Sequence, residues 1–250
     1  GLRTGDLTVR VNGGSLVAQV GTTHYIAWHQ VFYSFIGKYT STIYEVPRYR
    51  PDKKPEYEWT IYATLHPQDK WILEQPKDKV PEWVKQSKEL FLAYLAGYTD
   101  SEGTWYGGAR RYNRPPEKGG KPYYRLMFSL TSNSKSLLED IEDAMRKLLG
   151  IRAYVTKAHR ENEPRRYSKK PGYKLIALGN DAAELAELLL PYLKHPERIR
   201  RAKLAIQQKG KTLTQKDIEE WKKLKQQVKE QVRKDIELAR KIYEQKHKTP

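Results

Sequence analysis

The residues SKELFLAYLAGYTDSEGTW (87–105) contain an apolar helix that ends in acidic residues and glycine. Its apolar and small side chains are Leu90, Leu92, Ala93, Leu95, Ala96 and Gly97. Small residues on a helix surface let two backbones approach closely, so this helix is expected to pack tightly against a second helix. The helix ends at Asp100-Ser101-Glu102-Gly103, which places a carboxylate at the mouth of that interface, and carboxylate oxygens suit Mg²⁺.

The chain after this helix reads as strand, helix, strand, strand, helix. Apolar and polar residues alternate in YYRLMFSL (123–130), which predicts a strand with Tyr124, Leu126, Phe128 and Leu130 on one face. The next helix begins with a Ser136/Glu139 capping box and ends at Gly150. Two strands (151–160 and 172–180) and the helix DAAELAELLLPYLK (181–194) follow.

The same order of elements occurs earlier in the chain. A strand at SLVAQV (15–20) precedes the helix HYIAWHQVFYSFIG (24–37), for which Thr22 or Thr23 is the expected cap and Gly37 the left-handed stop. The strands TSTIYEVPR (40–48) and EYEWTIYATL (56–65) come next. The sequence therefore predicts two copies of one α+β unit.

Changes in composition set the predicted domain boundaries. The first unit spans residues 1–74, and the Pro-rich, charged segment QPKDKVPEWVKQ (75–86) is the predicted linker. The second unit spans 87–210, and a Lys/Glu/Gln-rich helical extension, which begins at Thr214 and Asp217, fills most of 211–250.

Composition narrows the function classes. Lys and Arg number 47 against 30 Asp and Glu, and the net charge of +17 favours a nucleic-acid partner. The absence of cysteine excludes disulfides, thiolate metal sites and cysteine nucleophiles. His24 and His29 lie five residues apart on one helix, so zinc is not expected there, and the glycine pairs match no nucleotide-binding loop. The sequence contains no recognisable membrane span or signal peptide, so we expect a protein of the prokaryotic cytoplasm or nucleoid. Its composition resembles that of thermophiles, and we expect the source to be an archaeon.

LAGYTDSEG resembles the LAGLIDADG motif of homing endonucleases, with Leu95, Ala96, Gly97, Asp100, Glu102 and Gly103 in matching places. Glu102 holds the position of the family's metal-binding carboxylate. The predicted duplication places a second motif in GLRTGDLTV at the start of the chain, where Gly1 falls on Gly97 and Asp6 on Glu102. Thr4 replaces Asp100 and Leu7 replaces Gly103. The helix that should lead into Gly1 is missing, so the sequence is truncated, a partner supplies the helix, or the first site is damaged.

The resemblance implies two pseudo-symmetric αββαββα units in a monomer, with curved antiparallel sheets that form a DNA-binding saddle. It implies a site-specific, intron-homing endonuclease that cleaves double-stranded DNA across the minor groove and leaves short 3′ overhangs. Asp6 and Glu102 would hold Mg²⁺, and Ca²⁺ or Mn²⁺ could occupy the same sites. A basic residue beside each scissile phosphate is also implied: Lys194 or Arg198 for the second unit, and Lys70, Lys77 or Lys79 for the first.

Outward-facing strand residues form the predicted base-reading set, and loop arginines the predicted phosphate-binding set. The first set is Thr8, Arg10, Asn12, Gln19, Tyr123, Arg125, Ser129, Arg152 and Tyr154. The second set is Arg48, Arg50, Arg110, Arg111, Arg114, Arg165 and Arg166. Two alternatives use the same basic surface: an RNA maturase that binds intron RNA and assists splicing, and a noncatalytic DNA-binding descendant.

Overall fold

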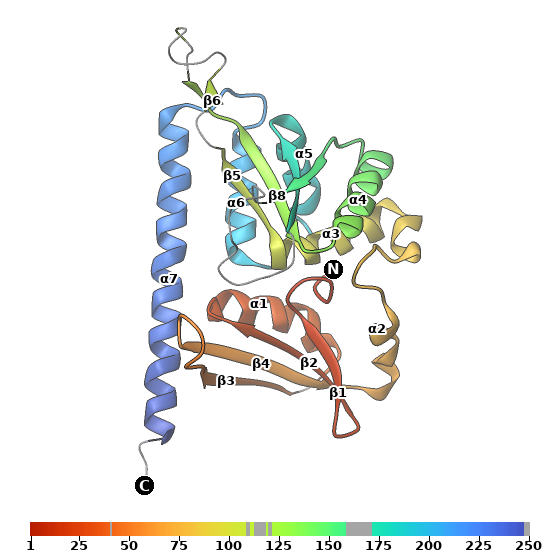
Figure 1. Ribbon diagram of the computed structural model, residues 1–250, viewed down its shortest axis with the longest axis vertical. Helices are drawn as coiled ribbons and strands as arrows, with labels where there is room; N and C mark the ends of the chain where they lie inside the picture. Colours follow the sequence, from red (N-terminus) through yellow and green to blue (C-terminus); the bar gives the residue numbers. More distant parts are fainter. Residues whose placement is uncertain (41, 109–110, 113–118, 120–121, 159–171, 248–250) are drawn as a thin grey trace. The chain divides into compact units, whose positions relative to one another are not determined.

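A computed structural model describes the chain except residues 41, 109–110, 113–118, 120–121, 159–171 and 248–250 (Figure 1). The chain divides into two compact units. The α3 unit comprises Gly1–Gly5, Pro76–Leu193 and Arg198–Lys222, and the α1 unit comprises Asp6–Gln75, Lys194–Glu197 and Lys223–Pro250. Each unit contains one four-stranded antiparallel sheet, which confirms the predicted α+β class.

The sheet of the α1 unit has the order β1-β2-β4-β3. Its strands are β1 (Thr8–Asn12), β2 (Ser15–Thr22), β3 (Ile43–Tyr49) and β4 (Tyr57–Leu65). Gly13 and Gly14 have φ values of 55° and 81°, which is the two-residue turn that matches strand twist in a hairpin. Leu16, Ala18 and Val20 are buried and alternate along β2 with exposed or half-buried residues, so one face of the sheet forms the core.

Helix α1 (Tyr25–Phe35) contacts β4 and buries Trp28, Val31 and Phe32. The prediction of Gly37 as a left-handed stop is wrong. The helix tightens instead into the 3-10 turn η1 (Ile36–Lys38), and Gly37 is not among the glycines with positive φ. A 3-10 turn satisfies the terminal carbonyl groups without a left-handed residue. After β4, the short elements η2 (Pro67–Lys70) and α2 (Trp71–Glu74) complete this part of the chain.

The sheet of the α3 unit has the order β5-β8-β10-β9, which repeats the pattern of the α1 unit. Its strands are β5 (Gly103–Gly107), β8 (Leu126–Ser132), β9 (Tyr154–Lys157) and β10 (Tyr173–Leu178). Its helices are α3 (Lys88–Glu102), α4 (Lys135–Ala144), α5 (Asn180–Leu189) and α6 (Pro196–Gln207), whose first two residues belong to the α1 unit. The shared strand order confirms that the two units follow one plan.

Three details of the α3 unit differ from the prediction. The strand expected at 123–130 is interrupted, because β7 (Pro122–Tyr123) pairs with β6 (Arg111–Tyr112) and β8 begins only at Leu126. The cap of α4 is Ser134, which accepts from the Leu137 amide, whereas the Ser136 hydroxyl donates to the Asp78 carbonyl. The helix expected at 181–194 ends at Leu189, two residues before Pro191. Gly150 has the predicted positive φ, after the π-helical turn η5 (Met145–Leu149).

Residues 75–86 are partly packed into the α3 unit. They include the 3-10 turn η3 (Glu82–Gln86), and Val80 and Val84 are fully buried. The Val80 amide donates to Asp140, and the Lys85 ammonium pairs with the same carboxylate at 3.0 Å. Core packing and hydrogen bonds therefore fix this segment to the α3 unit, so it is more than a covalent connection.

Helix α7 (Gln215–His247) begins as predicted, because the Thr214 hydroxyl and the Asp217 carboxylate cap each other's backbone amides. In the α3 unit it buries Ile218 and Trp221. In the α1 unit, the Trp59 indole donates to the carbonyl oxygen of Asp235 at 2.9 Å. Among the described residues, no helix combines the length and the apolar character that a bilayer crossing needs.

Candidate functional site

Residues 1–5 form a helical turn that packs against α3. The amides of Thr4 and Gly5 donate to the Gly1 carbonyl at 3.0 and 3.3 Å. A Cβ atom added at Gly1 would lie 1.9 Å from the carbonyl oxygen of Tyr94, so the two backbones are in direct contact. The Thr4 hydroxyl also lies 3.1 Å from the Tyr94 hydroxyl. This is the close approach that the small residues of α3 predict.

Equivalent residues of the two motifs meet in this contact. A Cβ at Gly97 would lie 3.6 Å from the Cα of Gly1, and a Cβ at Gly5 would lie 2.4 Å from the Cβ of Ser101. The sequence separation that relates Gly1 to Gly97 also relates Gly5 to Ser101. Contacts between equivalent positions are expected at a twofold axis. The packing therefore supports the alignment of the two motifs.

Glu102 is the last residue of α3 and is half-buried beside a cavity of about 500 Å³. The lining residues are Thr4, Lys77, Tyr98, Glu102, Thr131, Ser132, Asn133 and Ser134. Asp100, two residues earlier, is only 1% exposed, so the helix directs one acid into the packed interior and the other to the cavity. Hydroxyl, amide and carboxylate oxygens are the ligands that Mg²⁺ and Ca²⁺ prefer, and the lining fits such an ion.

Lys77 is the basic residue in the lining of this cavity. Its pKa is lowered, first because protein atoms displace water from its ammonium group and second because the positive charge of Arg3 acts on it. Lys70 and Lys79, the other candidates for the first unit, are not among the lining residues. The structure thus brings Lys77 together with Glu102 inside the α3 unit.

The other predicted catalytic residues lie elsewhere in the chain. Asp6 is exposed and is the first residue of the α1 unit, directly after Gly5. Lys194 is half-buried in the short segment Lys194–Glu197 of the α1 unit, and Arg198 is half-buried in the part of α6 that belongs to the α3 unit. The pairing of Asp6 with Glu102, and the roles of Lys194 and Arg198, stay predictions.

Polar side chains line a shallow cavity of about 830 Å³ on the sheet of the α1 unit. The predicted residues Arg10, Asn12, Gln19 and Arg48 are among its lining residues. Thr8 faces Gln19 across the β1–β2 pair and is exposed. The Arg10 guanidinium donates to the Gln19 amide oxygen at 3.1 Å, which orders two hydrogen-bonding groups on one face.

Several lining residues of this cavity were missed at the sequence level. They include Thr60, Tyr62 and Thr64 of β4, and Tyr243 of α7. The three β4 residues alternate with the buried Trp59, Ile61 and Ala63, so the period of two in 56–65 could have identified them. No comparable signal in the sequence brings Tyr243 to this sheet.

The predicted interface residues of the α3 unit have mixed environments. Tyr154 is 44% exposed, but Ser129 is only 8% exposed and is poorly placed to read a base. The Arg125 guanidinium lies 5.3 Å from the centre of the Tyr123 ring, and Arg152 pairs with Asp181 at 3.3 Å.

The predicted phosphate-binding arginines are only partly covered by the structure. Arg50 pairs with Asp52 and Glu58, both at 3.4 Å, so its charge is partly compensated, whereas Arg48 is exposed. Arg110, Arg114, Arg165 and Arg166, and the side chain of Arg111, lie outside the described residues.

Comparison with protein families matches residues 89–189 to the model of a LAGLIDADG-like domain. Residues 89–189 are a LAGLIDADG-like domain. The domain runs from the first turn of α3 to the end of α5 and contains Glu102. No curated protein matches the chain.

Several solved structures are similar to the chain over most of its length. The homing endonuclease I-SmaMI bound to cleaved DNA is 10% identical, over 90% of this chain and 93% of that one, with a TM-score of 0.47. The homing endonuclease I-WcaI bound to its DNA recognition sequence is 13% identical, over 80% and 81%, with a TM-score of 0.48. Full-length WhiA from Thermatoga maritima is 13% identical over 83% of this chain, with a TM-score of 0.44, and the chain covers 57% of that protein.

The LAGLIDADG-like domain ends before α6 and excludes the α1 unit. The sheet of the α1 unit nevertheless has the same strand order as the sheet of the matched domain. The duplication is therefore visible in the topology of the chain beyond the stretch that the family model covers.

Proposed function

We propose that the protein is a site-specific, metal-dependent endonuclease of the intron-homing type that cleaves double-stranded DNA as a monomer. The observation that carries the proposal is the contact between Gly5 and Ser101 at equivalent positions of the two motifs. Asp6 and Glu102 each follow that pair by one peptide bond, and Glu102 lines a cavity of oxygen donors. The proposal includes one carboxylate per motif and cleavage across the minor groove that leaves short 3′ overhangs.

Each carboxylate has a defined part in the proposed mechanism. Asp6 and Glu102 supply the oxygen ligands for Mg²⁺, with Ca²⁺ or Mn²⁺ able to occupy the same places. When bound, the metal neutralises charge on the phosphate and lowers the pKa of an attacking water.

Lys77 is suited to act beside the carboxylate of Glu102. Its lowered pKa reflects an ammonium group that has lost part of its water, so its charge acts more strongly on a nearby phosphate oxygen. Lys77 therefore stabilises the negative charge that develops as the phosphodiester is cleaved.

The polar face of the α1 unit supplies the DNA contacts. Arg10 and Gln19 present ordered donors and acceptors that suit base edges, and the exposed Arg48 suits a phosphate. The net charge of +17 attracts the DNA backbone and makes affinity fall as salt rises.

Selection of cleaved molecules from a random DNA library in Mg²⁺ tests the proposal and identifies the target. With that target, Glu102→Gln and Asp6→Asn should lower cleavage by at least ~10²-fold while DNA binding persists. Glu89→Gln is the matched control, because Glu89 is an exposed acid in the first turn of the same helix. Cleavage by Glu102→Gln at the wild-type rate would refute the assignment.

A noncatalytic DNA-binding protein is the second candidate. The first motif favours it, because Leu7 replaces the family's glycine and is 5% exposed, so this motif departs from the pattern at a buried position. Selective DNA binding in Ca²⁺, without cleavage in Mg²⁺, would identify this function. If the site at Asp6 alone is inactive, nicking should replace double-strand cleavage. The comparisons lend no support to an intron-RNA partner.

A further inference from the structure

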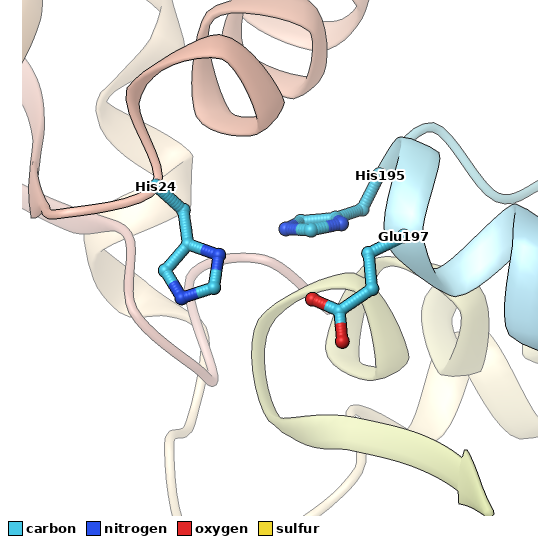
Figure 2. A group of neighbouring side chains, drawn as sticks. All are labelled: His24, His195 and Glu197. Carbon is cyan, nitrogen blue, oxygen red and sulfur yellow. The ribbon is translucent and has the colours of Figure 1, made fainter. Parts of the chain in front are cut away.

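We infer that His24, His195 and Glu197 form a binding site for a divalent transition metal, with Zn²⁺ as the favoured ion (Figure 2). All three residues belong to the α1 unit. The inference is independent of the proposed nuclease function, because none of the three residues has a part in it.

The three side chains converge on one small space. Figure 2 shows the His24 ring, from the turn before α1, facing the side chains of His195 and Glu197 at the start of α6. One potential ligand atom from each residue lies within 4.8 Å of the other two, and the imidazole centroids are 6.2 Å apart. Ligand atoms of a tetrahedral zinc ion are about 3.3 Å apart at normal bond lengths, so small side-chain rotations close the site.

Local backbone structure holds the ligands in place. The His24 amide donates to the Thr22 hydroxyl at 2.9 Å, and the His24 side chain makes no capping hydrogen bond to α1. Pro196 restricts the backbone of His195 and begins α6, which places Glu197 in the first turn. His195 and Glu197 are therefore presented from one rigid helix start, opposite His24.

Burial and donor chemistry favour a transition metal. His195 is 2% exposed and Glu197 is 9% exposed, so a carboxylate and an imidazole lie together out of solvent. Two imidazole nitrogens and one carboxylate oxygen suit Zn²⁺ and related ions, whereas Mg²⁺ prefers oxygen ligands. This separates the site chemically from the cavity at Glu102.

A metal titration tests the inference directly. Full-length protein without a polyhistidine tag is stripped with a chelator and titrated with Zn²⁺ against a chromogenic competitor, in excess Mg²⁺. The expected result is one tight Zn²⁺ per chain that Mg²⁺ does not displace. His24→Ala and Glu197→Gln should each weaken that binding by more than ~100-fold, because each removes a direct ligand. His29→Ala is the matched control, since His29 lies on α1 and pairs with Glu45 instead.

Co²⁺ substitution provides a readout that depends on no variant. Visible absorption typical of a four-coordinate site with nitrogen and oxygen ligands is expected for the wild-type protein, and its loss is expected in folded Glu197→Gln, a substitution of nearly the same shape. Absent absorption in the wild type, equal weakening by His29→Ala, or displacement of Zn²⁺ by Mg²⁺ would each overturn the inference. Those outcomes would leave an imidazole–carboxylate cluster without metal.

Discussion

The contact between Gly5 and Ser101 predicts a strong dependence of stability on side-chain size. A Cβ at Gly5 would lie 2.4 Å from the Ser101 Cβ and 2.7 Å from its hydroxyl oxygen. The Cβ of Ser101 cannot rotate away, so Gly5→Ala must separate the segment 1–5 from α3. Overpacking of this kind costs about 1–3 kcal/mol. Complete release of the segment would mainly expose Leu2, whose burial contributes about 2 kcal/mol to the free energy of unfolding. We therefore expect Gly5→Ala to lower the free energy of unfolding by about 1–2 kcal/mol.

A double-mutant cycle isolates this contact. Ser101→Gly alone should cost about 0.5 kcal/mol, since glycine is a poorer helix former than serine. In the double variant the clash is absent, so the total cost should stay near that of Ser101→Gly, with a coupling of about 1–2 kcal/mol. Urea denaturation at neutral pH measures all four free energies of unfolding.

Gly37→Ala is the control for the general effect of replacing glycine. Gly37 lies in a 3-10 turn, has no neighbour within 4 Å of an added Cβ and lacks a positive φ. This variant should be neutral or slightly stabilising, by about 0.5 kcal/mol. The reasoning fails if Gly5→Ala costs no more than Gly37→Ala, or if the effects of Gly5→Ala and Ser101→Gly simply add.

Three further predictions concern the α7 helix and the proposed DNA-binding face of the α1 unit. Asp235→Ala should destabilise the protein by about 1–3 kcal/mol, because the buried carboxylate accepts hydrogen bonds from the Ile26 amide and the Gln231 side chain. The control Glu230→Ala, on the same helix, should cost less than about 0.5 kcal/mol in the same urea assay. Hydrogen bonds from Thr214, first from its backbone and then from its hydroxyl, hold the pKa of Asp217 below its ordinary value of 3.8. The stability from that carboxylate is therefore present at neutral pH and is lost as the pH falls through the folded pKa, so wild type and Asp217→Asn should differ at pH 7 and converge in acid. With a selected DNA target, Arg48→Ala should reduce the slope of log affinity against log salt by about 0.9, whereas Lys88→Ala, at the start of α3, should leave it unchanged.

Local patterns in the sequence predicted the elements that depend on local chemistry. The small residues of α3 and the capping pair of Thr214 and Asp217 both have the expected structure. Predictions at helix ends were less accurate where two similar residues compete. Ser134 caps α4 rather than Ser136, because tertiary contact with Asp78 occupies the Ser136 hydroxyl.

The candidate site residues could be predicted where their signal lies in one short stretch of sequence. Glu102 was predicted from its own motif and lines a cavity, and its metal-binding role stays a prediction. Lys77 could not be separated from Lys70 and Lys79, because only the fold shows which lysine reaches the cavity. The cluster of His24, His195 and Glu197 was missed entirely, since residues so far apart in the sequence have no periodicity that relates them.

The meeting of equivalent residues in the packing of residues 1–5 on α3 constrains how these motifs can evolve. A residue near a twofold axis has its own counterpart as a neighbour, so enlargement of either member of a pair must be accommodated by the other. Gly1 with Gly97 and Gly5 with Ser101 should therefore change jointly or stay small, while surface positions of the two repeats diverge freely. Sequence similarity between the two repeats should therefore persist longest where residues 1–5 contact α3.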